Sequence, residues 1–352
     1  MSVDSKIEWC DATWNPISGC TKVSAGCDHC YAETFAERWR GTPGHHFEQG
    51  FDVRLWPDRL TIPWKWKRPR RIFVNSMSDL FHEAVPDGFI AQVWDVMGQS
   101  PQHTFIILTK RHARMRSWVT RWADRSNDRA SDRPDGMPPL ARGPEAVRAA
   151  YAGGRALLFA DMLDSMGTPP PGAAYPLYDW MEGWRHWPAV LPNVWLGCSV
   201  EDQKWADVRI PALLRTPAAV RFISAEPLRG PIDLTGQPGL GCEETGPAVI
   251  HHGYSTRTDY GTGSEWDCDH QAGLDWVIAG GESGPGARPC DLAWLRSLAL
   301  QCQRAEVPYF AKQLGSVLGR QLGAGSKGGD WEAWPEDLRI RQFPRAAEAV
   351  PA

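Results

Sequence analysis

The sequence has no run of about 18 consecutive apolar residues, the length that a membrane-spanning helix needs. Its first residues, MSVDSKIEWCDATW, have no apolar core of the kind found in secretion signals. The sequence therefore lacks the usual features of membrane proteins and of secreted proteins. We therefore expect a cytoplasmic protein with reduced thiols and no membrane partner.

The sequence also lacks a large excess of either positive or negative charge. The chain has 38 Lys and Arg against 42 Asp and Glu, a formal net charge of −4. This excludes the broad basic field of many nucleic-acid-binding proteins, so any contact with nucleic acid would be local. Nine cysteines are present, and because nine is odd they cannot all pair as disulfides. In a reducing compartment such cysteines indicate metal binding or reactivity.

Six short apolar runs are continuous rather than alternating, which is typical of strands buried on both faces of a parallel sheet. They are RIFVNS (71–76), TFIILT (104–109), NVWLGCSV (193–200), AVRFISA (219–225), LDWVIAG (274–280) and VPYFAKQ (307–313). Amphipathic helical patterns, as over 87–100 and 291–305, separate most of them. The order predicts an α/β protein, either a β/α barrel or an open sheet.

Two stretches interrupt this order. Residues 121–190 are rich in Asp, Arg, Pro and Gly, and residues 236–272 are rich in turn formers. We expect both to be loop-rich insertions rather than barrel units. The predicted organisation is a barrel over residues 1–320 and a C-terminal tail over 321–352.

The segment GCTKVSAGCDHCYAE contains Cys20, Cys27 and Cys30 with the spacing Cys-x6-Cys-x2-Cys. Three cysteines on one loop suit a [4Fe–4S] cluster whose fourth iron is free to bind S-adenosylmethionine. A closed zinc site normally has four ligands, and Cys10 or His29 could supply the fourth. From the residues alone, both the open cluster and zinc remain alternatives.

Polar residues follow the predicted strands, where the carboxyl ends of parallel strands build active sites. Among them are Ser76, Asp79, Lys110, Glu201, Glu226 and the run from Gly280 to Ser283. Lys110 begins a basic stretch, KRHAR (110–114), that suits an anionic substrate or the carboxylate of S-adenosylmethionine. A second basic segment, WKWKRPRR (64–71), has two interleaved Trp and is the best local indication of nucleic-acid binding.

The second insertion holds further candidate metal ligands. These are Cys242, His251, His252, Cys268 and His270. Their spacing matches no standard zinc finger, so a second metal site there is an open question.

Five segments in order carry a resemblance to a known family: IEWCDATWNPISGCTKVSAGCDHCYAE, IFVNSMSDLFHEAVP, FISAEPLRGPID, WVIAGGESGPGARP and PYFAKQLG. The chain resembles the phage-type three-cysteine-motif family, which is radical-SAM-like and distantly similar to spore photoproduct lyase. The resemblance implies a partial or complete β/α barrel of the radical SAM type. It also implies a [4Fe–4S] cluster on Cys20, Cys27 and Cys30, with S-adenosylmethionine as the second cofactor.

The resemblance also suggests roles for residues near the cluster. His29 stands where many radical SAM enzymes have an adenine-stacking aromatic residue, and Tyr31 could take that part. Asp79 or Ser76 is expected to bind the methionine ammonium, because the Gly-Gly-Glu motif lies near the end of the barrel. Further contacts to substrate or ribose are expected from Glu201, Gly280, Gly281, Glu282 and Ser283. The catalytic candidates are Cys198 as hydrogen donor, Glu226 and Lys110.

Two functions follow from this reading. The first is a radical S-adenosylmethionine enzyme that forms a 5′-deoxyadenosyl radical, with a nucleic-acid base or nucleotide as substrate and an unnamed electron donor. The second is a non-catalytic zinc- or cluster-binding phage or mobile-element protein that acts with a separately encoded partner protein.

Overall fold

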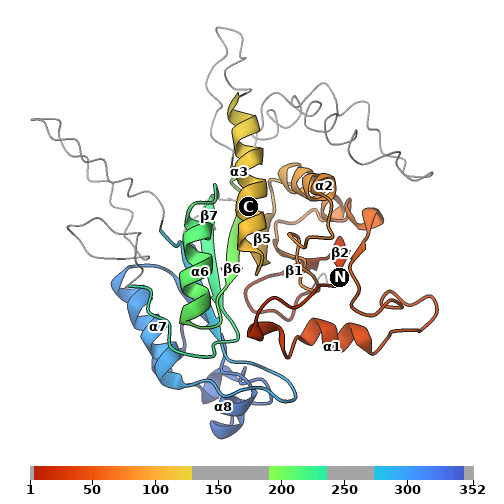
Figure 1. Cartoon of the computed structure of the whole chain (residues 1–352). Coiled ribbons are helices and arrows are strands. Elements are labelled where there is room, and N and C mark those ends of the chain that lie inside the picture. The colour runs from red at the N-terminus through yellow and green to blue at the C-terminus, as the bar shows by residue number, and fades with distance from the viewer. Residues whose placement is uncertain (1–3, 129–189, 236–272, 345–352) are drawn as a thin grey trace, which may run out of the picture.

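A computed structural model describes residues 4–128, 190–235 and 273–344. Its centre is a seven-stranded parallel sheet in which the strands follow one another in chain order. The strands are β1 (Ala12–Trp14), β4 (Arg71–Val74), β5 (Thr104–Thr109), β6 (Val194–Ser199), β7 (Val220–Ala225), β8 (Trp276–Gly280) and β9 (Tyr309–Gln313). Sequential parallel order is the arrangement of a β/α barrel, and within the described residues β1 and β9 are the outermost strands, with the segment around Arg341 bridged to β9. The fold is thus a half-barrel, which confirms the predicted parallel α/β architecture (Figure 1).

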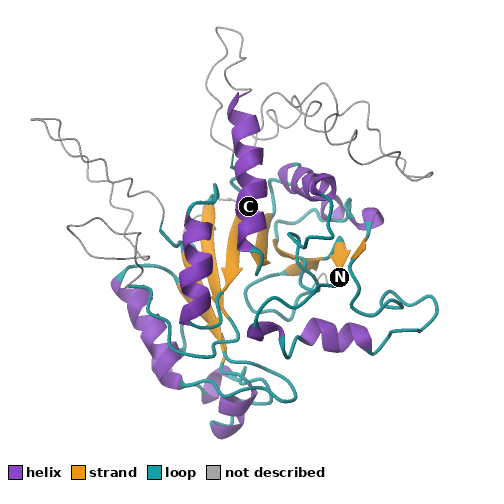
Figure 2. Cartoon of the chain, viewed as in Figure 1, coloured by secondary structure: helices purple, strands orange, loops and turns teal. Residues whose placement is uncertain are grey.

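Four helices pack on the outer face of the sheet, as Figure 2 shows. They are α2 (Asp87–Gly98), α3 (His112–Asp128), α6 (Gln203–Leu214) and α7 (Leu292–Arg304). Asp202 and Asp291 cap α6 and α7 by accepting hydrogen bonds from backbone N–H groups of the first turn. The other α-helices are α1 (Tyr31–Glu37) and α8 (Ser316–Gln321), and two short strands, β2 (Ile17–Ser18) and β3 (Arg54–Leu55), form a separate antiparallel pair. No helix in these described ranges is long and apolar enough to cross a membrane.

The period-2 alternation of strand side chains divides the core in two. On β6, Val194, Leu196 and Cys198 pack outward with the helices, whereas Trp195 points to the inner, concave face. The inner face holds a second cluster built mainly of aromatic rings, to which all strands from β4 to β9 contribute. We call it the inner aromatic cluster; its members are Trp9, Cys10, Phe73, Ile106, Trp195, Val220, Phe222, Trp276, Ile278 and Phe310. It fills the half-barrel below the carboxyl ends of the strands.

The structure adds one strand and changes two predicted segments. β1 was missed, because a three-residue strand has too few residues to show a pattern. The predicted insertion at 121–190 begins too early, since α3 continues to Asp128. The predicted tail is not separate either: Trp334 and Leu338 are buried in the outer core, and Phe343 packs on the inner aromatic cluster.

Candidate functional site

Residues 20–30, here called the cysteine loop, hold Cys20, Cys27 and Cys30 as free, half-buried thiols. A short 3-10 turn (Ala25–Cys27) lies inside the loop, and α1 starts directly after Cys30. Side chains from the carboxyl ends of β6 and β8 hold the loop in place. It therefore lies across the end of the half-barrel at which the sequence predicted an active site.

Glu201, which follows β6, holds the middle of the loop. Its fully buried carboxylate accepts a hydrogen bond from Ser24 Oγ at 2.8 Å and one from Arg209 Nη1 at 2.9 Å. Lys110 Nζ lies 3.4 Å from its Oε1. Gly26 lies so close that a Cβ there would come within 2.3 Å of Oε1, so only glycine fits. Glu201 is thus occupied in holding the loop rather than free to orient a substrate.

Glu282, which follows β8, holds the far end. Arg288 donates to it through Nε at 2.8 Å and Nη2 at 2.6 Å, and also reaches Asp28 at 3.1 Å. His29 Nδ1 lies 3.5 Å from the same carboxylate. Burial alone would raise the pKa of Glu282, but the hydrogen bonds and charge of Arg288 outweigh it and lower the pKa. The carboxylate of the Gly-Gly-Glu motif therefore forms an ion pair with Arg288, and this pair positions the loop and His29.

A third contact holds the start of the loop. Thr21 Oγ1 lies 2.9 Å from His82 Nε2 and accepts a hydrogen bond from Arg111 Nη2 at 2.7 Å. Burial raises the pKa of the neighbouring Cys20 thiol to about 11, and the charge of Asp79 adds to the effect.

The spacing of the three thiols bears on the kind of metal centre they could hold. Within residues 4–128, 190–235 and 273–344, no three Cys, His, Asp or Glu side chains gather closely enough to hold one metal ion. A [4Fe–4S] cluster binds each cysteine through a different iron, so its ligands lie farther apart than those of a single ion. Cys10 does not join the loop: it is buried in the inner aromatic cluster and its thiol donates to Ser5 Oγ.

Asp79 and Ser76 take structural roles. The Thr109 hydroxyl donates to the Asp79 carboxylate, with Oγ1 at 2.7 and 2.8 Å from its two oxygens, and the backbone N–H groups of Phe81 and Lys110 donate to it as well. Ser76 Oγ bonds the side chain of Asn15, and its backbone carbonyl accepts a hydrogen bond from the Tyr31 hydroxyl. Asp79 therefore connects the segments that follow β4 and β5. Because its carboxylate already accepts these hydrogen bonds, few of its lone pairs are left for the ammonium group that it was expected to bind.

Above the inner aromatic cluster, Glu226 after β7 accepts a hydrogen bond from Lys312 Nζ of β9 at 2.6 Å. Gln313 Nε2 lies 3.3 Å from the same oxygen. The Tyr31 side chain lies within electrostatic range of Glu226 and of the Cys30 thiol. Glu226 and Tyr31 thus lie in one region at this end of the sheet.

Two buried polar side chains near these strand ends have no hydrogen-bond partner. Asn75, directly after β4, is 3% exposed, and neither its amide nitrogen nor its amide oxygen is bonded. Its backbone φ is +62°, an uncommon conformation for a residue other than glycine. Ser224 Oγ is also unbonded and belongs to the strand positions that face inward. Unpaired buried groups are costly, so both are candidates for contact with a bound molecule.

Other predicted residues lie elsewhere. Gly281 serves a close backbone contact, because a Cβ there would meet Leu314 O at 2.2 Å, and Gly280 lies against Gln313 in a similar way. Ser283 is half-buried in the segment that follows. Cys198 is fully buried in the outer core, and burial raises the pKa of its thiol to about 12. This position, among the helices, does not suit a hydrogen donor on the inner side.

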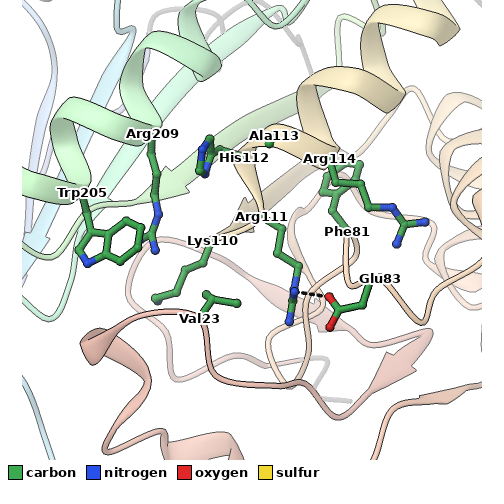
Figure 3. A pocket seen from close by; sticks show the side chains of 10 residues that line it. All are labelled: Val23, Phe81, Glu83, Lys110, Arg111, His112, Ala113, Arg114, Trp205 and Arg209. Carbon is green, nitrogen blue, oxygen red and sulfur yellow. Dashed lines mark hydrogen bonds and ion pairs between the residues drawn. The ribbon is translucent and has the colours of Figure 1, made fainter.

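An open pocket of about 320 Å³ lies between the cysteine loop, the start of α3 and α6 (Figure 3). It is lined by Val23, Phe81, Glu83, Lys110, Arg111, His112, Ala113, Arg114, Trp205 and Arg209. We call it the cationic pocket, because Lys and Arg side chains outnumber its carboxylates. The basic stretch after β5 therefore lies at the strand ends beside the cysteine loop.

The other basic segment, residues 64–71, lies at the opposite end of the sheet, where β4 begins. Arg71 pairs with Asp11 at 2.9 Å and is part of the fold. Lys65, Lys67 and Arg68 are exposed, so nucleic-acid binding there stays a prediction. The candidate second metal site at Cys242, His251, His252, Cys268 and His270 lies outside the described residues.

Comparison with known proteins gives one match. Residues 4–335 match the family described as "Protein of unknown function (DUF5131)". The chain belongs to this family. The DUF5131 match covers the cysteine loop and every strand of the half-barrel. No curated protein and no solved structure matches the chain.

Sequence reasoning missed the residues that hold the loop. Arg288 lies six positions after Glu282 and Arg209 eight after Glu201. Each arginine follows its carboxylate closely in the chain, which is the one local signal that could have identified the pairs. Asn75 and Lys312 carried no signal beyond their places at strand ends.

Proposed function

We propose that this protein is a radical S-adenosylmethionine enzyme, with a [4Fe–4S] cluster on Cys20, Cys27 and Cys30. The observation that carries the proposal is the cysteine loop itself. It presents three free, half-buried thiols across the carboxyl ends of a parallel half-barrel, held by two carboxylate–arginine pairs. A loop fixed by buried ion pairs can keep an oxygen-sensitive cofactor in one position above the inner face.

The residues beneath the loop fit a polar second cofactor. Asn75 and Ser224 offer unbonded amide and hydroxyl groups, and Glu226 offers a carboxylate held by Lys312. We propose that these side chains hold S-adenosylmethionine or the substrate. Cys20, Cys27 and Cys30 would hold the cluster, which, with an electron donor, would supply reductive cleavage of S-adenosylmethionine and hydrogen abstraction from the substrate.

The protein's own groups serve this chemistry by position. Glu201 and Glu282 hold the cysteine loop at two points, and the inner aromatic cluster closes the half-barrel below the site. The aromatic rings exclude water from the region where a radical would act. Tyr31, whose hydroxyl bonds the Ser76 carbonyl, connects the loop to the end of β4.

The test is anaerobic reconstitution with iron, sulfide and a chemical reductant, followed by measurement of cluster absorbance and of 5′-deoxyadenosine. Wild-type protein is expected to form both. Cys27→Ser is expected to lose the product and to bind less iron. Cys302→Ala is the matched control, because Cys302 is a buried thiol of the outer core. Reconstituted wild type with neither cluster absorbance nor 5′-deoxyadenosine would refute the proposal.

A separate observation favours the second candidate, a binding protein that acts with a partner. Tyr31 and Phe35 of α1 and Trp39 just after its end are 38–59% exposed and lie four residues apart in the chain. Exposed aromatic stripes of this kind mark interaction surfaces. Stoichiometric zinc that resists chelation, with no affinity for S-adenosylmethionine, would favour this function over the enzyme.

A further inference from the structure

The cationic pocket carries a further inference, which starts from the charges that line it. Four Lys and Arg side chains face it, against the single lining carboxylate of Glu83. Figure 3 shows Arg209 descending from α6, and Lys110 and Arg111 extending from the turn before α3, with Val23 of the cysteine loop opposite. Positive side chains from α6 and from the turn before α3 therefore line the pocket, and the cysteine loop bounds it on the opposite side.

Several of these cations are already paired. Arg114 donates to the Val85 carbonyl at 2.6 Å and to Asp87 at 2.8 Å, and Arg111 pairs with Glu83. Lys110 lies 3.4 Å from Glu201. These bonds fix the positions of the side chains. They do not use every donor, because the Nε of Arg111 has no hydrogen-bond partner.

Arg209 is the decisive residue. It is fully buried, and its Nη1 donates to the Ser199 carbonyl at 2.7 Å and to Glu201 at 2.9 Å. Its Nε and Nη2 have no partner, although the side chain lines the pocket. The guanidinium lies 4.1 Å from the centroid of the Trp205 ring, which holds its plane. Arg209 thus keeps two buried N–H donors unused by the protein, in the wall of the pocket, and such donors suit an anion.

The first turn of α3 adds to this site. His112, Ala113 and Arg114 line the pocket and are the first residues of a 17-residue helix that has no acidic residue in its first turn. The first N–H groups of a helix lack partners within the helix, and they carry its positive dipole end. Phosphate is the common ligand of such a combination.

We propose that the cationic pocket binds a phosphate group of a nucleotide substrate. The substrate assignment rests on the proposed radical function, whereas phosphate binding does not need the cluster. Because Val23 and Lys110 connect the pocket with the cysteine loop and with Glu201, a bound phosphate would orient the rest of the nucleotide toward the region beneath the loop. The phosphate belongs to a mononucleotide or to the backbone of a single strand.

The experiment is calorimetric titration of the full chain, without cluster, in a low-salt buffer free of phosphate and sulfate. The probes are inorganic phosphate, uridine 5′-monophosphate, uridine, and a single-stranded oligonucleotide without terminal phosphates. We expect the mononucleotide or the oligonucleotide to bind at least about tenfold more tightly than uridine, since hydrogen bonds to charged groups dominate. The tighter of the two identifies the source of the phosphate.

Variants separate this pocket from general charge. Arg111→Gln and Lys110→Gln are each expected to weaken binding about tenfold. Arg209→Lys keeps the charge but removes the second N–H donor group, and should weaken binding too. The control is Arg116→Gln, an equal loss of charge at an exposed position of α3 outside the pocket, with less than a twofold effect expected.

Equal binding by wild type and by folded Arg111→Gln and Lys110→Gln would overturn the proposal. So would inorganic phosphate binding as tightly as both nucleotide probes, because the nucleotide would then contribute nothing. Failure of the radical function looks different: it is a lack of 5′-deoxyadenosine in reconstituted protein, whatever the calorimetry gives.

Discussion

The contact between Gly26 and Glu201 allows a sharp test of how the cysteine loop is held. In Gly26→Ala, the new Cβ would come within 2.3 Å of Oε1, 2.4 Å of Cγ and 2.6 Å of Cδ of Glu201. Glu201 cannot turn away, because Arg209 holds one carboxylate oxygen while Ser24 and Lys110 hold the other. The loop must therefore lift off the strand ends.

The cost has two parts. Overpacking of a filled site costs about 1–3 kcal/mol, and a lifted loop also loses the hydrogen bond from Ser24 to the Glu201 carboxylate, worth about 1.5–3 kcal/mol. Replacing glycine by alanine restricts the unfolded chain and returns about 0.4–1 kcal/mol. We expect a net loss of about 2–5 kcal/mol in the free energy of unfolding, or a melting temperature lower by roughly 5–10 °C.

The assay is thermal unfolding followed by tryptophan fluorescence, together with iron content after anaerobic reconstitution. Gly329→Ala is the control, because a Cβ at Gly329 meets no atom within 4 Å. Its melting temperature should stay close to that of wild type. If Gly26→Ala melts like the control and binds as much iron as wild type, the loop is not held against Glu201 as we describe.

Two further predictions concern the same loop. Arg288→Gln should lower the free energy of unfolding by about 2 kcal/mol at pH 7, because Glu282 loses its partner. Since the folded state lowers the pKa of Glu282, this stabilisation is present above the ordinary carboxyl pKa and is lost as pH falls through the lowered value. Urea unfolding at pH 7 and pH 3 should therefore show the two proteins converging in acid, and a constant difference would contradict this. The second prediction concerns labelling of the thiols with iodoacetamide at pH 8, read by mass spectrometry. Half-buried Cys27 should react before Cys10, because burial raises the pKa of the Cys10 thiol to about 11. Faster labelling of Cys10 would show that the inner aromatic cluster opens.

Much of the fold could be predicted because buried parallel strands have a strong local pattern. The strand predicted at 104–109 is β5 residue for residue, and the helix predicted at 87–100 differs from α2 only at its end. β1 escaped prediction because only its pairing with β4 makes three residues a strand. The packing of residues beyond 320 was also missed, since it depends on contacts such as that of Phe343 with the inner aromatic cluster.

The site was predictable in location but not in detail. Strand-end positions correctly indicated that Lys110, Glu201, Glu226 and Glu282 lie at one end of the sheet. Whether such a carboxylate is free or paired depends on a third element, and no spacing rule shows that Arg209 or Arg288 will reach it. Asp79 is the clearest case, because Thr109 and the Lys110 backbone bond it only once β4 and β5 are side by side.

The contacts of the cysteine loop also determine the order of assembly. Ser24 bonds a residue 177 positions later, and Asp28 bonds one 260 positions later. Such non-local contacts form late, because the long intervening chain must first be closed into a loop. During synthesis, the thiols near the N-terminus leave the ribosome long before Arg288 exists to hold them. Any cofactor loaded at these thiols would thus meet its finished site only after nearly the whole barrel has been made.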